Sequence, residues 1–368
     1  MNQKDKKHEN KRIKVGITHG DFNGVSYEVI INSLKDNRIV DLFVPVIYGL
    51  SKVLAYYRKA LKLNDFNYNV TKDAIKLYMR KVNIVNISNE EVKIETGKST
   101  PEAGKMALLA LQLAVKDIKE KKIDVIVTAP LNKANIQSDE FNFPGHTEYL
   151  ASEFGISDYL MLMVHNNLRV GTVTGHIPVK DISASLNEEL ILSKLEVFNK
   201  SLIRDFGISR PKIAVMGLNP HIGDKGLLGS EDEEIILPAL ISAKKNGILA
   251  YGPFAADGFF GSNELSKYDG VLAMYHDQGL APFKSIAHTG GVNFTAGLPI
   301  VRTSPAHGTA YNIAGNQKSS PSSMREAMYL AKDILRARNK YDKENENPLA
   351  FGIAGKKPIP KTTEDRSS

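Results

Sequence analysis

The sequence predicts an α/β fold, and two observations support this. Short apolar runs rich in Val and Ile alternate with longer stretches of helical periodicity along most of the 368 residues. Several of the short runs are apolar at every position, which is typical of strands in a parallel sheet that helices cover on both faces. The length corresponds to about two domains of ordinary size.

The predicted strands are β-branched, apolar runs of four to seven residues, which is a normal strand length. In chain order they are Ile13–Thr18, Phe43–Tyr48, Val82–Ile87, Ile123–Thr128, Tyr159–Val164, Leu168–Thr174, Lys212–Leu218, Ile248–Tyr251 and Gly270–Tyr275. The helical patterns between and after them are Gly24–Leu34, Pro101–Lys119, Glu188–Phe206, Glu231–Asn246 and Pro321–Ala337.

One helix start is well marked. Thr100 is a good N-cap and Pro101 suits the first helical position. The preceding Gly97-Lys98-Ser99 imitates the end of a phosphate-binding loop, but Val92 stands where such a loop needs its first glycine. This segment therefore predicts a helix cap. The dinucleotide fingerprint of glycines after a strand is also absent, so the residues that bind any nicotinamide cofactor stay unassigned.

Composition excludes several function classes. The chain has no cysteine, which rules out disulfides, thiolate metal sites and cysteine nucleophiles. Most of the net charge of +7 lies in the two ends, since residues 1–14 hold six Lys/Arg against two Asp/Glu and residues 355–368 hold four against two. No basic face is left for a nucleic acid. We expect a cytoplasmic protein with no membrane segment and with flexible tails at 1–11 and 346–368.

Polar residues follow several predicted strands, where parallel sheets place their ligand sites. Three of them are histidines, His176, His221 and His276, and three imidazoles with an open position are typical of a catalytic zinc-type metal site. Asp277 and Asp257 lie nearby in the sequence and either orient an imidazole or act as a base. The alternative is that each histidine and aspartate satisfies a local backbone partner.

A second group of residues indicates anion binding. A phosphate or carboxylate suits cationic and polar side chains set among glycine-rich turns, and arginine adds a two-pronged grip. The residues concerned are His146, Thr147, Lys284, Asn293 and Arg302. The alternative for any single lysine is ordinary surface charge.

Five motifs in chain order resemble those of the 4-hydroxythreonine-4-phosphate dehydrogenases, which make a precursor of pyridoxal phosphate. They are Gly145-His146-Thr147-Glu148, Leu218-Asn219-Pro220-His221, Tyr275-His276-Asp277-Gln278, Gly297-Leu298-Pro299 with Arg302-Thr303-Ser304, and His307-Gly308-Thr309-Ala310. The resemblance covers nearly the whole chain. It implies a two-lobed fold like that of isocitrate and isopropylmalate dehydrogenases, with a cleft between residues 12–146 plus 295–345 and residues 147–294.

The resemblance also implies roles for the residues. His176, His221 and His276 correspond to metal ligands, for Zn, Mg or Co, and the anion-binding group corresponds to the substrate site. The implied reaction oxidises 4-phosphooxy-L-threonine with NAD or NADP to 2-amino-3-oxo-4-phosphooxybutanoate, which decarboxylates to 3-amino-2-oxopropyl phosphate. The implied assembly is a homodimer with a shared active site, its interface in residues 147–294.

Two departures from the family pattern keep alternatives open. The N-terminal motif reads Gly20-Asp21-Phe22-Asn23-Gly24-Val25-Ser26-Tyr27-Glu28 and lacks both of the family's prolines, and Ala306 stands where the family often has aspartate. A phosphothreonate or phosphoerythronate dehydrogenase on the same scaffold is therefore the main alternative. A metal-binding protein that senses phosphosugars without catalysis is the other.

Overall fold

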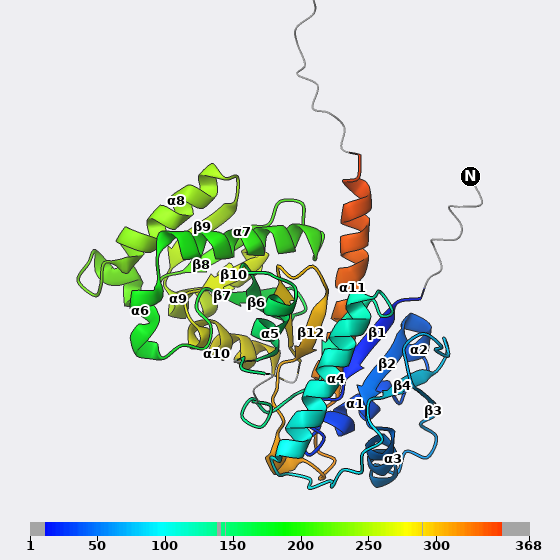
Figure 1. Ribbon diagram of the computed structural model, residues 1–368. Helices are drawn as coiled ribbons and strands as arrows, with labels where there is room; N and C mark the ends of the chain where they lie inside the picture. Colours follow the sequence, from blue (N-terminus) through cyan, green and yellow to red (C-terminus); the bar gives the residue numbers. More distant parts are fainter. Residues whose placement is uncertain (1–11, 138–140, 144, 289, 348–368) are drawn as a thin grey trace, which may run out of the picture.

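The computed structural model describes residues 12–137, 141–143, 145–288 and 290–347. A single 12-stranded sheet runs through the molecule with a layer of helices on each face, which confirms the α/β class (Figure 1). The predicted tails lie outside the described residues, apart from positions 346 and 347. Within the described ranges, no helix is long and apolar enough to cross a membrane.

The sheet has one half built mainly from early segments of the chain and one half built from later segments. From one edge to the other its strands are β3 (Tyr68–Thr71), β4 (Val82–Asn86), β2 (Val44–Gly49), β1 (Lys14–Thr18), β5 (Val125–Thr128), β12 (Arg302–Pro305), β11 (Val292–Ala296), β6 (Leu160–His165), β7 (Leu168–Thr172), β10 (Gly270–Ala273), β8 (Lys212–Met216) and β9 (Leu249–Phe254). The predicted lobe boundaries fall at the first turn of α5 (His146–Glu153) and inside β11, and the division itself stays a prediction.

The expectation of a wholly parallel sheet is wrong at three neighbouring pairs. β12 with β11, β11 with β6, and β6 with β7 are antiparallel. Only Asn166 and Asn167 connect β6 to β7, and two residues are far too few for a parallel crossover. Asn166 takes the left-handed conformation that such a tight turn requires, with φ of 51°.

The helices form two layers. Against one face pack α1 (Ser26–Leu34), α3 (Ser51–Ala60), α7 (Glu188–Arg204), α8 (Leu237–Lys245) and α11 (Ser322–Glu344), and against the other pack α4 (Pro101–Lys119), α5 and α10 (His276–Ala287). Three short helices complete the set: α2 (Ile39–Leu42), α6 (Ile182–Ser185) and α9 (Ala256–Phe260). The predicted cap is confirmed, because Ala103 N–H donates to the Thr100 hydroxyl at 3.3 Å.

Some elements differ from the prediction for physical reasons. The predicted helix Glu231–Asn246 starts with a π-helical turn, Asp232–Ile236, and only then becomes α8. Among the elements that were not predicted are the strands β11 and β12 and the helices α5 and α10. Polar residues interrupt the apolar pattern of both strands, and α10 contains Gly279 and Pro282, which weaken any helical signal.

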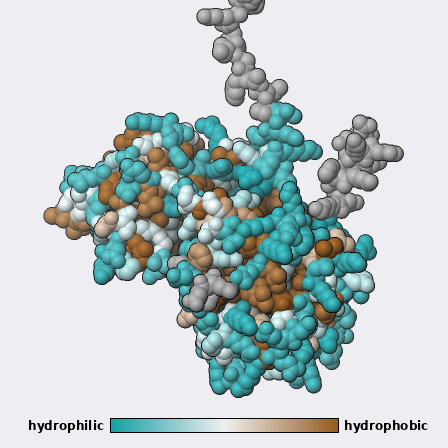
Figure 2. All heavy atoms as spheres, viewed as in Figure 1, coloured by the Kyte–Doolittle hydropathy of each residue, from teal (hydrophilic) through white to brown (hydrophobic). Residues whose placement is uncertain are grey.

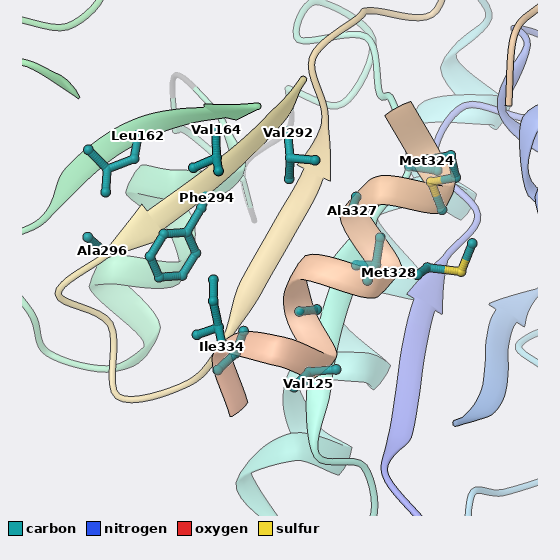
Figure 3. Packing of buried hydrophobic residues seen from close by; sticks show 14 of the residues in the cluster. Val125, Leu162, Val164, Val292, Phe294, Ala296, Met324, Ala327, Met328 and Ile334 are labelled. Carbon is teal, nitrogen blue, oxygen red and sulfur yellow. The ribbon is translucent and has the colours of Figure 1, made fainter. Parts of the chain in front are cut away.

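The central strand β11 presents apolar side chains on one face and the polar Asn293 and Thr295 on the other, while its neighbour β6 is apolar on both faces. On one face Leu162, Val164 and Phe294 belong to the same hydrophobic cluster as Met328 and Ile334 of α11 (Figure 3). Because side chains alternate along a strand, the residues between them point to the other face. On that other face the buried apolar residues form two separate clusters, one under α4 and α5 and one under α10. A cavity lies between them.

Candidate active site

The cavity has a volume of about 360 Å³, and its floor is the sheet face turned away from α11. The register of β12, β11 and β6 places the residues of this floor side by side on neighbouring strands. Thr295 of β11 lies opposite Met161 of β6, and Asn293 lies between Ser304 of β12 and Met163 of β6. Seven of the ten predicted site residues line this one cavity: His146, Thr147, His176, His276, Lys284, Asn293 and Arg302.

Arg302 is buried in the floor with only 3% of its surface exposed. Its Nε and Nη2 donate to the Thr128 hydroxyl at 3.1 and 2.7 Å, and its Nη1 donates to the Thr295 hydroxyl at 3.3 Å. No carboxylate among the described residues forms an ion pair with it. Burial lowers the pKa of Arg302 to about 10, so the side chain stays positively charged at neutral pH. A buried cation with no ion-pair partner favours an anionic ligand.

His146 and Thr147 form the first turn of α5, at the same end of the cavity as Arg302. The Thr147 hydroxyl lies 3.5 Å from Arg302 Nη1. Burial, and then the positive charges of Arg302 and Lys133, hold the pKa of His146 well below its usual value. His146 is therefore neutral at pH 7 and offers one ring N–H to a ligand. The backbone N–H groups at the start of a helix add to the attraction for an anion.

The charges around the cavity are strongly unequal. Lys133, Lys194 and Lys284 line it together with Arg302. Among the described lining residues, Glu148 is the one carboxylate. This excess of positive charge matches a ligand that carries a phosphate, a carboxylate or both.

Two of the predicted metal ligands meet at another part of the cavity. His176 follows β7, and His276 follows the neighbouring strand β10 and begins α10; their ring centroids are 5.3 Å apart. His276 Nδ1 lies 2.7 Å from the Asp277 carboxylate, which leaves Nε2 facing outward as a ligand. Burial lowers the pKa of His176, which favours the neutral ring that a metal requires.

His221 is not part of this pair. It follows β8, the other neighbour of β10, but it is exposed and does not line the cavity. Within the part of the chain that the structure describes, no three His, Asp or Glu side chains form a metal-binding group. The chemistry of His176 and His276 fits two ligands of a divalent metal, and one chain alone does not bring the third into place.

The two predicted carboxylates do not line the cavity. Asp277 is exposed, and its carboxylate contacts His276. Asp257 lies in the first turn of α9 and is exposed. The geometry within one chain thus favours the orienting role for Asp277 over the role of base.

Among the cavity residues that were not predicted as site residues are the charged or titratable Lys133, Lys194 and His307. Lys133 and His307 both follow strand ends, and this position in the sequence is a signal that could have identified them. Lys194 comes from the middle of α7, where its ammonium donates to Tyr159 O at 2.7 Å. Nothing in the local sequence distinguishes it from Lys200, the other lysine of that helix.

These features define a class of protein: an α/β protein with a positively charged cavity, suited to a small anionic ligand, beside a pair of histidines. The family model described as "Pyridoxal phosphate biosynthetic protein PdxA" matches residues 41–331. The chain belongs to this family, and the resemblance found in the sequence is confirmed. Because the relatives are named dehydrogenases, the predicted enzyme class is confirmed as well.

Relatives and solved structures agree with the family. The chain is 52% identical over 342 residues to a 4-hydroxythreonine-4-phosphate dehydrogenase of Bacteroides thetaiotaomicron, covering 93% of this chain and 94% of the relative. It is 36% identical over 327 residues to an Oceanobacillus iheyensis protein provisionally named D-threonate 4-phosphate dehydrogenase, covering 88% and 98%. A crystal structure of 4-hydroxythreonine-4-phosphate dehydrogenase from Klebsiella pneumoniae superimposes with a TM-score of 0.76 at 33% identity, covering 89% and 99%.

Proposed function

We propose that this enzyme oxidises 4-phosphooxy-L-threonine with NAD or NADP. The product, 2-amino-3-oxo-4-phosphooxybutanoate, then loses CO₂ to give 3-amino-2-oxopropyl phosphate. The observation that carries the proposal is the arrangement of one cavity, in which the buried Arg302 and the histidine pair His176 and His276 line the same space. A phosphate at Arg302 leaves the rest of a short substrate to extend toward the histidines.

The side chains that hold the phosphate in this proposal are already oriented by hydrogen bonds to other residues of the protein. Thr128 fixes the plane of the Arg302 guanidinium, so that Nη1 faces Thr147 and Thr295. The neutral His146 ring and the Thr147 hydroxyl donate hydrogen bonds, and Lys284 adds charge. Asn293 contributes a buried side-chain oxygen that has no protein partner among the described residues and can accept a hydrogen bond from the substrate.

Oxidation takes place at the histidine end of the cavity in this proposal. His176, His221 and His276 would hold a divalent metal (Zn, Mg or Co), which when bound would lower the pKa of the substrate hydroxyl, and a bound nicotinamide would supply the hydride acceptor. Asp277 orients His276. The hydroxyl proton leaves to a base, for which Asp257 qualifies only if a second protomer brings it to the cavity. The ketone formed is β to the carboxylate, which permits loss of CO₂.

We propose further that the enzyme is a cytoplasmic homodimer whose active site contains residues of both protomers. Residues 147–294 expose several large apolar side chains, among them Val179 at 80%, Leu227 at 79% and Ile241 at 50%. Hydrophobic side chains gather on the surface around α8 (Figure 2). His221 lies six residues from Leu227 and is exposed on the same segment. An apolar surface of this kind supports an interface between subunits.

The second candidate function is oxidation of 4-phospho-D-threonate, which the relative from Oceanobacillus iheyensis supports. The higher identity to the Bacteroides thetaiotaomicron dehydrogenase favours the amino substrate. The two substrates differ mainly at C2, where one carries an amine and the other a hydroxyl. The relatives are named dehydrogenases, which disfavours the alternative of a phosphosugar sensor without catalysis.

The deciding experiment measures NADH and NADPH formation with both substrates, before and after treatment with a chelator. We expect a higher kcat/KM for 4-phosphooxy-L-threonine, loss of activity with chelator, and recovery on adding a divalent metal. His276→Ala serves as the inactive control. A higher kcat/KM for phosphothreonate would replace the proposed substrate with the second candidate. Metal binding without any reduced cofactor from either substrate would contradict the enzyme assignment.

A further inference from the structure

We propose that Gln278 and Asp232 are positioning residues that hold residues 217–219 from two sides. These three residues lead from the end of β8 into His221. Gln278 and Asp232 thereby set where His221 lies on its own protomer. This inference rests on the proposed function, because it takes the two histidines to be metal ligands.

Gln278 connects the two histidine-bearing segments directly. It lies in the first turn of α10, two residues after His276. Its Oε1 accepts a hydrogen bond from Met274 N at 2.7 Å, and its Nε2 donates to Gly217 O at 2.6 Å. One half-buried side-chain amide therefore joins the end of β10 to the residue that follows β8.

Asp232 holds the same segment from the opposite direction. It is 1% exposed and starts the π-helical turn that precedes α8. Its Oδ1 accepts from Leu218 N at 2.8 Å, and its Oδ2 accepts from Asn219 N at 3.1 Å and from Asn219 Nδ2 at 3.0 Å. A buried carboxylate that has no cation beside it needs several hydrogen-bond donors. Here three N–H groups of two adjacent residues supply them.

The fit around Asp232 extends to Gly217. A Cβ atom at residue 217 would lie 2.6 Å from Asp232 Oδ1, which is closer than real Cβ contacts. Glycine at this position therefore lets the carboxylate approach the chain. Gly217 N–H is bonded in turn to Phe254 O at 2.8 Å, which ties the segment to β9.

The backbone conformation of residues 221–225 explains why the preceding residues 217–219 need to be held in place. His221, Ile222, Gly223, Asp224 and Lys225 all have φ between 44° and 74°. Side chains make this left-handed conformation unfavourable, so such a run persists only where its surroundings hold it. Because residues 217–219 are fixed on both sides, the run starts from a defined point, and His221 keeps a defined position.

Metal affinity depends on where each ligand is held. We therefore expect metal binding to weaken when the contacts of Gln278 or Asp232 with residues 217–219 are lost. Loss of groups that orient metal ligands typically weakens metal binding by about 10- to 100-fold without removing a ligand. Gln278→Glu keeps the acceptor for Met274 N but replaces the donor to Gly217 O with a second acceptor. Asp232→Asn keeps one acceptor but turns an N–H group toward the donors of Asn219. Both changes preserve side-chain size.

The experiment titrates Co²⁺ into the full-length apoprotein and records affinity together with the visible absorption spectrum, which reports the number and geometry of ligands. The variants are Gln278→Glu and Asp232→Asn, with His276→Ala as the ligand-loss reference. Matched controls are Gln317→Glu, which removes a similar donation to a backbone oxygen, that of Ala60, and Asp269→Asn, which removes an acceptor of Lys212 N at the other end of β8. Inorganic phosphate affinity and the melting temperature are measured in parallel.

We expect Gln278→Glu and Asp232→Asn to weaken Co²⁺ binding about 10- to 100-fold and to alter the spectrum, while phosphate affinity stays within twofold of wild type. The controls should bind Co²⁺ like wild type. Normal Co²⁺ affinity and spectrum in Gln278→Glu would overturn the inference, even if Asp232→Asn does not fold. If His276→Ala also binds Co²⁺ normally, the metal site of the proposed function is itself wrong, and the two failures are thereby distinguished.

Discussion

Two nitrogen atoms of Arg302, Nε and Nη2, donate to the single hydroxyl of Thr128, at 3.1 and 2.7 Å. The two residues belong to β12 and β5, which are parallel neighbours at the centre of the sheet. This pairing fixes the guanidinium plane without neutralising its charge. The third nitrogen, Nη1, is left facing the hydroxyls of Thr147 and Thr295, in the cavity where an anion would bind.

The first prediction concerns this guanidinium. We expect Arg302→Lys to raise KM for the phosphorylated substrate about 10- to 100-fold with little change in kcat, because an ammonium cannot reproduce the planar set of donors. The size follows from a hydrogen bond to a charged group, which contributes about 1.5–3 kcal/mol. Steady-state kinetics measure it, with Arg169→Lys, a partly buried arginine outside the cavity, as the control. An unchanged KM would remove Arg302 from the substrate site.

The second prediction concerns Thr128. Thr128→Val keeps the shape of the side chain but leaves two donors of Arg302 without their acceptor. We expect a loss of stability of about 1–3 kcal/mol and a weaker stabilisation by inorganic phosphate, because the guanidinium is no longer held in place. Thermal denaturation with and without phosphate measures both effects.

Thr303→Val is the matched control for Thr128→Val. Its hydroxyl donates to Ala327 O on the opposite face of the sheet, toward α11. This variant should lose stability but keep the full response to phosphate. An equal loss of phosphate response in both variants would show that Thr128 acts only through general stability.

The third prediction concerns the shared active site. Mixing His221→Ala and His276→Ala, each inactive alone, should restore activity if His221 and His276 of one site come from different protomers. Random reassembly would give roughly a quarter of the wild-type activity, since half the dimers are mixed and each mixed dimer has one intact site. Reassembly after mild denaturation, followed by NADH assays, measures the recovery.

The pair His176→Ala and His276→Ala is the control, because these two rings lie 5.3 Å apart within one chain. We expect this pair to stay inactive. Sedimentation that shows a fully active monomer would contradict the dimer and the shared site together.

The fourth prediction concerns pH and a residue far from catalysis. His19 is fully buried, and burial lowers its pKa to about 4, although its Nε2 contact with Met106 O raises it in part. Its pKa in the unfolded chain is about 6.5, so acid protonates the unfolded state first. The folded protein therefore keeps its full stability above pH 6.5 and loses up to about 3 kcal/mol from this residue between pH 6.5 and 4.

His19→Gln removes the titrating group and keeps a side-chain donor for Met106 O. Chemical denaturation from pH 7 to pH 4.5 should show a flatter decline for this variant than for wild type. His8→Gln, in the charged N-terminal segment, is the corresponding control and should not alter how the free energy of unfolding depends on pH. Parallel curves for His19→Gln and wild type would show that His19 is not the group responsible.

Local patterns in the sequence were enough to predict most of the fold. The apolar runs of β1, β5 and β8 and the caps and periodicity of α4 and α7 depend on neighbouring residues, so these elements were predicted within a few residues. β11 and β12 were missed because Asn293, Thr295, Arg302 and Ser304 face a polar cavity on one side of the sheet. These polar residues break the continuous apolar run by which the other strands were predicted.

The sequence by itself determined the α/β class, the family and seven residues of one cavity, because these follow from residue types and motifs in chain order. Only the tertiary structure decided which residues meet. Strand register brings Arg302, Asn293 and Thr172 onto one floor, and neighbouring strands bring His176 to His276, while His221 stays outside the cavity in one chain. The physical reason is that contacts between strands far apart in the sequence depend on their order and register, which no local pattern specifies.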